Sequence, residues 1–216
     1  MISKRYILIQ SIVIFLLMAT SLSAQSHFDN IDWQYTKTDK NVKVYTVHGS
    51  ECNYYKAEMT AAAQNGITAA DLSNAINDFA KYMEIFKPVE QFKAVGQTDK
   101  GKIVRAMTNF SPMYYRVYHI EMWTSSENGT YITEWQPYAG DIDRTVGKNQ
   151  KYVTHVYGRW TFRDNPDGTV YICTEHHNNW DYSGLSLATV TPFEQNVAAK
   201  NVRLIYEYVV NSKKQK

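Results

Sequence analysis

The C-terminal segment constrains the fold most, because it has the pattern of one long amphipathic helix. Residues at helical spacing form one stripe there, and all but Asn201 are apolar or aromatic: Phe193, Val197, Asn201, Leu204 and Tyr208, flanked by Ala198, Ile205 and Val209. Thr191 followed by Pro192 predicts the start of this helix, since Thr is a good N-cap and Pro is favoured at the first helical position. A helix of roughly five turns with one wide apolar face must pack against something large.

The chain before this helix supplies a β-sheet as that partner. Alternating apolar and polar runs predict strands over residues 41–47, 54–62, 89–95, 102–110, 114–123, 131–136, 151–163 and 169–178. One helix interrupts them, opening at Thr68 with Asp71 three residues on and ending at Pro88. The sequence therefore predicts an α+β fold, in which a curved antiparallel β-sheet of about seven strands grips the long C-terminal helix.

The N-terminus has the three parts of a secretory signal peptide. Lys4 and Arg5 precede a mostly apolar stretch at 7–18, and small residues at 21–24 follow it. The alternative is an uncleaved anchor, but roughly a dozen apolar residues fall short of the ~20 that a spanning helix needs. We expect a signal peptide over 1–24, a single domain over 25–216, and export to the periplasm or the outside of the cell.

The charge balance argues against nucleic acid as a partner. The whole chain has 23 basic and 21 acidic residues, and residues 1–24 contain two basic residues and no acid. Removing them leaves 21 against 21, a formal net charge of zero. Proteins that bind nucleic acid need a basic surplus on their surface.

The cysteines and histidines raise the questions of a disulfide and of a metal site. Cys52 and Cys173 are the only cysteines, and in an oxidising compartment they would form one disulfide or remain two separate thiols. His155 and residues 175–181 offer imidazole and carboxylate groups, but His176 and His177 are adjacent on a strand and point to opposite faces. With no HExxH or paired-Cys spacing we predict no metal site, and without GxGxxG or a P-loop we predict no cofactor.

A curved sheet does not close fully on a straight helix, so the predicted fold leaves a space between them. The side chains expected to line it share apolar strand or helix faces, and are Tyr118, Ile120, Met122, Trp135, Val156, Trp160, Phe162, His176, Phe193, Val197 and Leu204. Arg116 lies on the face of Tyr118 and would select the head group of an amphiphile. The alternative is that these side chains fill the space as an ordinary core.

Several short strings, in order, resemble the START-type lipid-binding domain of the helix-grip superfamily. They are Trp33 with residues 41–45, then residues 78–89, 111–116, 157–162 and 180–184, so the resemblance covers about residues 32–210. The family often has an acid after the arginine, where this chain has Val117 after Arg116. The resemblance implies binding of a lipid or another apolar molecule without a cofactor, although some relatives of the wider superfamily are cyclases or aromatases.

The sequence thus predicts an exported START-like protein that binds a lipid or amphipathic small molecule in an internal cavity, with transient membrane contact. Residues 137–150 and the start of the last helix would control entry. A second hypothesis is a cyclase- or hydratase-type enzyme that uses a cavity Tyr or a histidine, His155 or His176. A third is an envelope protein with a filled cavity whose surface binds a partner protein.

Overall fold

The computed structural model of the chain describes residues 26–111, 114–182 and 184–215. The predicted signal peptide at 1–24 lies outside the described residues, so its expectation stays a prediction. The chain divides into two units, residues 1–31 and residues 32–216. In the first unit, the described residues 26–31 contain a turn in which the backbone N–H of Ser26 donates to Oδ2 of Asp29 at 2.9 Å. The second unit carries the sheet and the helices.

One sheet organises the second unit, and ten strands are assigned to it in the described part of the chain. They are β1 (Gln34–Asp39), β2 (Val42–Val47), β3 (Tyr54–Ala62), β4 (Val89–Gln97), β5 (Lys102–Ser111), β6 (Tyr114–Glu127), β7 (Thr130–Pro137), β8 (Gln150–Tyr152), β9 (Val156–Asp164) and β10 (Thr169–Asn178). Their order is β1-β2-β3-β10-β9-β7-β6-β5-β4, all antiparallel, and the short β8 pairs with β6 in parallel. The α+β helix-grip prediction is confirmed, with more strands than expected.

Two local features account for the additional strands. The edge strand β1 is polar and largely exposed, so it carries little of the alternation that predicts a strand. The predicted strand at 151–163 is divided into β8 and β9, because residues 153–155 leave the ladder. That break places His155 in a loop beside the start of β9.

The predicted first helix is two helices, α2 (Ala69–Asn77) and α3 (Phe79–Ile85), preceded by the 3-10 turn η2 (Gln64–Gly66). The capping box is present as predicted: the Thr68 hydroxyl accepts from the N–H of Asp71, and the Asp71 carboxylate accepts from the N–H of Thr68. Asp78 ends α2 and caps α3, accepting from two backbone N–H groups of the next turn. One aspartate therefore turns the chain between the two helices.

The long helix α4 (Leu187–Lys214) begins earlier than predicted. Its N-cap is Ser186, whose hydroxyl accepts from the N–H of Thr189, so Pro192 lies inside the helix rather than at its first position. The prediction of a start at Thr191 is wrong because Ser186 provides an equally good cap one turn upstream. Among the described residues, no helix has the length and apolar character needed to cross a membrane.

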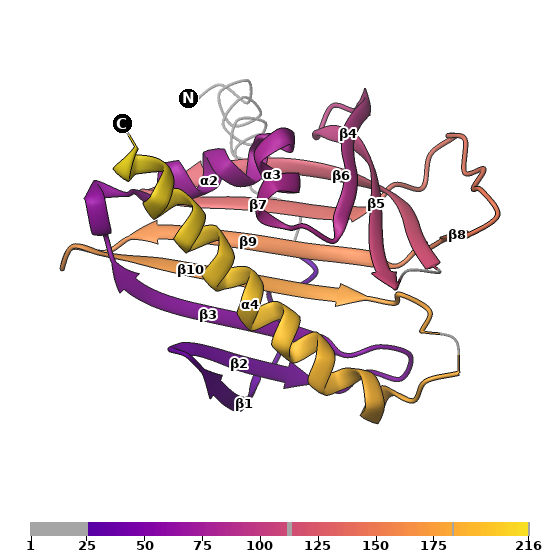
Figure 1. The fold of residues 1–216 in the computed structure, drawn as a ribbon, viewed down its shortest axis with the longest axis horizontal. Helices are drawn as coiled ribbons and strands as arrows, with labels where there is room; N and C mark the ends of the chain where they lie inside the picture. The colour runs from indigo at the N-terminus through magenta and orange to yellow at the C-terminus, as the bar shows by residue number, and fades with distance from the viewer. Residues whose placement is uncertain (1–25, 112–113, 183, 216) are drawn as a thin grey trace, which may run out of the picture. The chain divides into compact units, whose positions relative to one another are not determined.

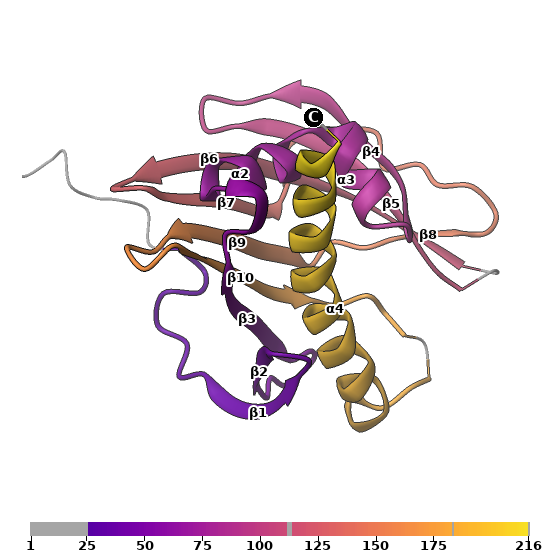
Figure 2. The same ribbon diagram turned by 60° about the vertical axis from the view of Figure 1, so that its left-hand side comes forward.

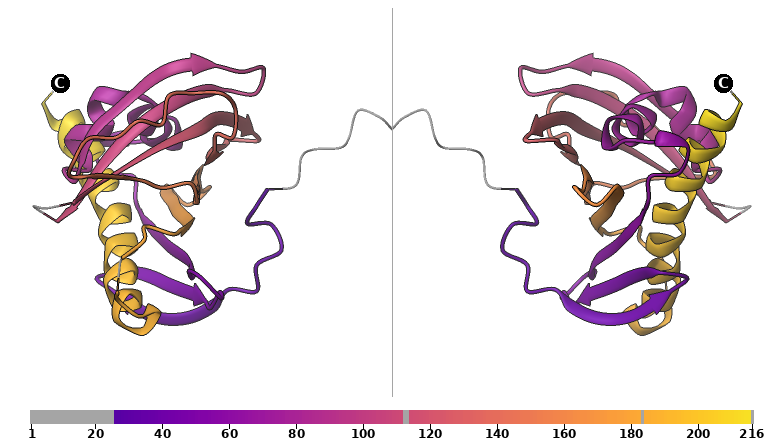
Figure 3. Two further views of the ribbon diagram at one scale, coloured as in Figure 1. Left: turned by 90° about the vertical axis from the view of Figure 1, so that its right-hand side faces the viewer. Right: turned by 90° about the vertical axis from the view of Figure 1, so that its left-hand side faces the viewer.

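Helix α4 crosses one face of the sheet over β3 and β10 (Figures 1 and 2), and the side views place it along one side of the strands (Figure 3). Its buried positions are Val190, Glu194, Gln195, Ala198, Ala199, Val202, Ile205, Val209 and Val210. The buried stripe is thus rotated from the predicted one, and Phe193 is 47% exposed. Two polar residues belong to the buried face because each has a partner; Gln195 donates to the hydroxyl of Thr46 at 2.9 Å.

Candidate functional site

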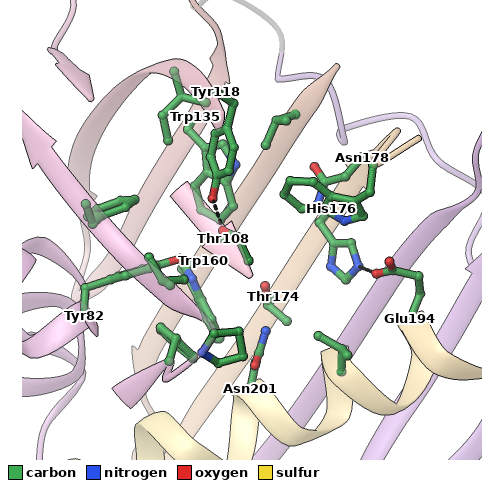
Figure 4. A pocket seen from close by; sticks show the side chains of 18 of the residues that line it. Tyr82, Thr108, Tyr118, Trp135, Trp160, Thr174, His176, Asn178, Glu194 and Asn201 are labelled. Atoms are coloured by element: carbon green, nitrogen blue, oxygen red, sulfur yellow. Dashed lines mark hydrogen bonds and ion pairs between the residues drawn. The ribbon is translucent and has the colours of Figure 1, made fainter. Parts of the chain in front are cut away.

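A cavity of about 310 Å³ lies between the sheet and α4, with α3 at one side (Figure 4). Its wall is mostly aromatic and aliphatic, and the lining residues are Tyr82, Phe86, Pro88, Val89, Phe92, Thr108, Asn109, Tyr118, Ile120, Met122, Trp135, Val156, Trp160, Thr174, His176, Asn178, Trp180, Phe193, Glu194, Val197 and Asn201. The space exists because the helix bridges a concave sheet face without filling it.

Nine of the twelve residues predicted to line the cavity do so: Tyr118, Ile120, Met122, Trp135, Val156, Trp160, His176, Phe193 and Val197. Tyr118, Ile120 and Met122 alternate along β6 and all line the cavity, so the predicted inward face of this part of the strand is the observed one. Whether each one touches a ligand stays a prediction.

Phe162 and Leu204 do not line the cavity. The ring of Phe162 is fully buried and stacks on Trp160 at a centroid distance of 5.7 Å, so it belongs to the core. Leu204 packs against the same core from α4. Both share an apolar face with lining residues but lie beyond the end of the cavity, and the sequence pattern shows the face without showing where the cavity ends.

Arg116 also lies outside the lining, which corrects the expected head-group role. Its Nε donates to the backbone carbonyl of Trp180, and its Nη2 donates to that of Asp181 at 2.7 Å. The side chain is only 7% exposed. The guanidinium therefore holds the loop between β10 and α4 against β6, and satisfies carbonyl groups that would otherwise be buried without donors.

One end of the cavity is polar. Nε2 of His176 lies 3.5 Å from Oε2 of Glu194, and the hydroxyl of Tyr182 donates to Oε1 of the same carboxylate. The ring of Tyr55 stacks on His176 at 5.2 Å, which fixes the plane of the imidazole. Within the described part of the chain, the buried Oδ1 of Asn178 has no hydrogen-bond partner. This end therefore offers a carboxylate, an imidazole and an unsatisfied acceptor.

The opposite end is apolar apart from one internal hydrogen bond. The hydroxyls of Tyr118 and Thr108 lie 3.1 Å apart, and burial raises the pKa of Tyr118 to about 12. Tyr82 stacks on Phe92 at 4.1 Å, and burial raises its pKa as well. Both phenols stay neutral at physiological pH, so this end carries no charge.

Sequence reasoning missed the wall made by α3 and the start of β4. Tyr82 comes from α3, Phe86 is the residue that caps its C-terminus, and Pro88, Val89 and Phe92 follow. The sequence contains an indication of this wall, because residues 78–89 form one of the strings that resemble the START family. None of residues 137–150 lines the cavity, so the expected entry loop is not part of its wall. The half-exposed Phe193, near the start of α4, does line it.

A glycine makes room for one wall residue. Gly158 on β9 pairs with Trp135 on β7, and a Cβ at this position would lie 1.9 Å from Cζ2 of the Trp135 ring. The indole therefore rests directly on the backbone of β9, which only a residue without a side chain allows.

Of the two alternatives left open for Cys52 and Cys173, the structure has separate thiols, both free and buried, and not the disulfide. Cys173 on β10 pairs across the ladder with Glu58 of β3, and Cys52 precedes Glu58 by six residues. At about 3.3 Å per residue this separates the two positions by roughly 20 Å, far beyond the ~7 Å limit between bridged Cα atoms. Burial raises the pKa of Cys52 to about 11.

Comparison with solved structures identifies the class to which this fold belongs. A STAR-related lipid transfer protein from Xanthomonas axonopodis superposes with a TM-score of 0.67 at 13% identity, covering 82% of this chain and 98% of that one. Human StAR-related lipid transfer protein 5 gives 0.67 at 14%, covering 95% and 94%. The Zhui aromatase/cyclase from Streptomyces gives 0.50 at 13%, covering 75% and 94%.

The fold is thus the START-type helix-grip fold, and the predicted resemblance is confirmed at this level. No protein-family profile matches the sequence, and no curated protein sequence matches it either. The identities are low, so the comparisons establish the fold, and the function must be argued from the cavity.

Proposed function

We propose that this protein binds one hydrophobic or amphipathic molecule in the cavity between the sheet and α4. The observation that carries the proposal is the cavity itself: about 310 Å³ of space with a wall made mostly of aromatic and aliphatic side chains. Burying apolar ligand surface there would contribute roughly 25 cal/mol per Å² before the costs of association. Similarity to lipid-transfer structures supports the same class of ligand.

The polar end favours a ligand with a polar head. The carboxylate of Glu194 and the unsatisfied Oδ1 of Asn178 both accept hydrogen bonds, and His176 lies beside them. A hydroxyl or amide N–H on the ligand would satisfy Asn178, whose unpaired oxygen otherwise costs about 1–3 kcal/mol. A negatively charged head would meet Glu194 instead, so we expect neutral, hydrogen-bond-donating heads to bind better than carboxylates.

The size of the cavity favours a compact ligand. About 310 Å³ lies at the low end of the roughly 300–1,000 Å³ range of small-molecule sites. One acyl chain or a small ring system would occupy this space more readily than a lipid with two long chains.

Native mass spectrometry of the untagged mature chain tests the proposal. We expect one non-covalent molecule per chain after gentle purification, or binding of one added single-chain alcohol or monoacylglycerol. The comparison series should include the matching fatty acid, a sterol and a diacyl phospholipid. A chain that is empty when purified and binds none of these molecules would overturn the proposal.

One observation keeps an enzymatic function as a second candidate. His176 and Glu194 form a close pair inside the cavity, at 3.5 Å, and such a pair can move a proton on a bound molecule. His155 does not line the cavity and has no part in this alternative. Turnover of a bound ligand that His176→Asn abolishes, with ligand binding retained, would favour the enzyme. The third hypothesis requires a filled interior, and the cavity argues against it.

We also propose that the protein acts after export, in the periplasm or outside the cell, with transient membrane contact when it loads its ligand. The signal-peptide pattern at residues 1–24 supports export. Intact mass of the protein from its native host should correspond to a chain that begins near Gln25. A full-length mass in a cytoplasmic fraction would contradict this part of the proposal.

A further inference from the structure

Three metal-ligating side chains converge outside the cavity wall: Cys52, His155 and His177. The thiol sulfur and one ring nitrogen of each histidine all lie within 4.8 Å of one another. Cys52 comes from the loop before β3, His155 from the loop before β9, and His177 from the end of β10. Three segments far apart in sequence therefore bring soft and borderline donors to one point.

The two imidazoles already face each other. Nε2 of His155 lies 3.1 Å from Nδ1 of His177, and their rings are nearly perpendicular at 89°. In a tetrahedral Zn²⁺ site with Zn–N bonds of 2.0–2.1 Å, two such nitrogens are about 3.3 Å apart. The sulfur would approach to about 3.6 Å from each nitrogen. The present spacing therefore needs a shift of about 1 Å, and Cys52 lies in a loop.

The surroundings restrict the orientation of one of the two histidines. The ring of Tyr54 stacks on His177 with centroids 3.6 Å apart, which restricts that imidazole. The carboxylate of Glu51, next to Cys52 in the sequence, places a negative charge near His155. A neutral imidazole is the form that binds a metal ion, and a nearby carboxylate stabilises a cation.

A second cavity borders one of the three ligands. Cys52 and Glu51 border a second cavity of about 210 Å³, which lies next to the loop between β10 and α4. His155 itself is half-buried. Of the three proposed ligands, Cys52 lines this cavity and the two histidines do not. Zinc sites with three protein ligands keep a bound water at the fourth position.

We propose that Cys52, His155 and His177 bind one borderline-soft transition-metal ion, of which Zn²⁺ is the reference case. One thiolate and two imidazoles match Zn²⁺ and Cu²⁺ and disfavour Mg²⁺ and Ca²⁺, which prefer oxygen ligands. Binding displaces the Cys52 thiol proton to solvent and involves no redox step. The ion would tie the loop before β3 to the ends of β9 and β10.

No sequence motif indicates this site, because its three ligands are far apart along the chain. Adjacent histidines on a strand point to opposite faces, and the sequence has no HExxH or paired-Cys spacing, so its local pattern predicts no metal site. The third ligand, Cys52, lies more than a hundred residues earlier and reaches the site only through the pairing of β3 with β10. His177 is available because alternation along β10 turns it away from His176 and the cavity.

Zn²⁺ binding to the untagged, chelator-treated full chain tests the proposal, with competition against a chromophoric chelator. We expect one Zn²⁺ per chain. Cys52→Ser, His155→Gln and His177→Asn should each weaken binding by at least about a hundredfold, since even outer-shell groups are worth roughly 10- to 100-fold. Bound Co²⁺ should show a thiolate charge-transfer band that Cys52→Ser removes.

The matched controls are Cys173→Ser, the other buried cysteine, and His176→Asn, the neighbouring histidine that faces the cavity. Both should bind Zn²⁺ as the parent chain does, and circular dichroism should show all variants folded. No stoichiometric Zn²⁺ binding by the parent chain, or equal losses in the controls and the ligand variants, would overturn the proposal. The assay contains no lipid, so its result is independent of the proposed cavity function.

Discussion

Nε2 of His176 lies 3.5 Å from Oε2 of Glu194, joining the middle of the sheet to α4 across one end of the cavity. Both side chains are almost completely buried, at 8% and 5% exposure. A buried carboxylate is tolerated only where donors surround it, and Tyr182 supplies another one. The polar end of the cavity is therefore held by mutual contacts among His176, Glu194 and Tyr182. We expect the effects of substitutions at these residues to be energetically coupled.

We expect Tyr182→Phe to lower the free energy of unfolding by about 1–3 kcal/mol, because it removes a donor from a buried carboxylate. In a Glu194→Gln background the same change should cost less, since the carboxylate is gone. Urea unfolding of the four variants of this cycle measures the coupling. The control is Tyr35→Phe, which removes a hydroxyl from an exposed ring. If Tyr182→Phe and Tyr35→Phe lowered the free energy of unfolding equally, the assigned role of Tyr182 would be contradicted.

Arg116 should act on stability rather than on the choice of head group. Arg116→Lys cannot keep both donations to the carbonyls of Trp180 and Asp181, so we expect a loss of about 1.5–3 kcal/mol in unfolding free energy. Arg163→Lys, at an exposed position, is the control. Any loss of ligand affinity should be the same for a fatty acid and its alcohol. A loss confined to the fatty acid would restore the head-group role.

Gly158→Ala should disturb the wall at Trp135. The new Cβ would overlap the indole, which must move, and forced repacking of this kind costs about 1–3 kcal/mol. We expect altered tryptophan fluorescence and weaker ligand binding. Gly147→Ala is the control, since a Cβ there meets its nearest atom at an ordinary 3.5 Å. A Gly158→Ala variant as stable as this control would show that Trp135 does not rest on the β9 backbone.

The free thiols should make stability fall at alkaline pH. Burial raises the pKa of Cys52 from 9.0 to about 11, so between these values the unfolded chain loses a proton that the folded chain keeps. The unfolded state then binds fewer protons, and the free energy of unfolding decreases as pH rises through this window. Burial raises the pKa of Cys173 in the same direction.

Urea unfolding between pH 8 and 11, in the presence of a chelator, measures this decrease, and Cys52→Ser should make it smaller while the contribution of Cys173 remains. Thiol titration under non-reducing conditions should find two reactive groups per unfolded chain and slow reaction in the folded one. A chain with no titratable thiol after unfolding would mean that a disulfide forms after all.

The fold could be predicted because the sequence patterns that indicate its strands and helices are local, and because these elements follow one another in a simple order along the chain. Alternation defined β2, β3 and β10, and the capping residues Thr68 and Asp71 marked the first helix. The prediction failed where local signals compete. Ser186 and Thr191 are both good caps, and only packing of α4 on the sheet selects the first. The polar β1 is a strand because it pairs with β2, which its own composition does not indicate.

The candidate site could be predicted in part, for a related reason. Strand alternation gave the inward face of β6 and the inward position of His176. It did not show where along each face the cavity ends, so Phe162 and Leu204 were included and the α3 wall was missed. Arg116 was given a ligand role because a charge on an inward face needs a partner. The partners are backbone carbonyls, which a side-chain pattern does not display.

The central claim is that the space beneath α4 receives the ligand, and filling that space tests it most directly. Val197 lines the cavity from α4, and Lys200, three residues further along the same helix, is exposed. Val197→Trp and Lys200→Trp add the same ring at a position that lines the cavity and at an exposed position that does not. Displacement of a bound fluorescent single-chain lipid compares the two variants after circular dichroism has shown both to be folded.

We predict that Val197→Trp loses at least about tenfold in affinity, equivalent to about 1.4 kcal/mol, while Lys200→Trp binds as the parent chain does. Equal affinity in all three proteins would place the ligand elsewhere and contradict the account.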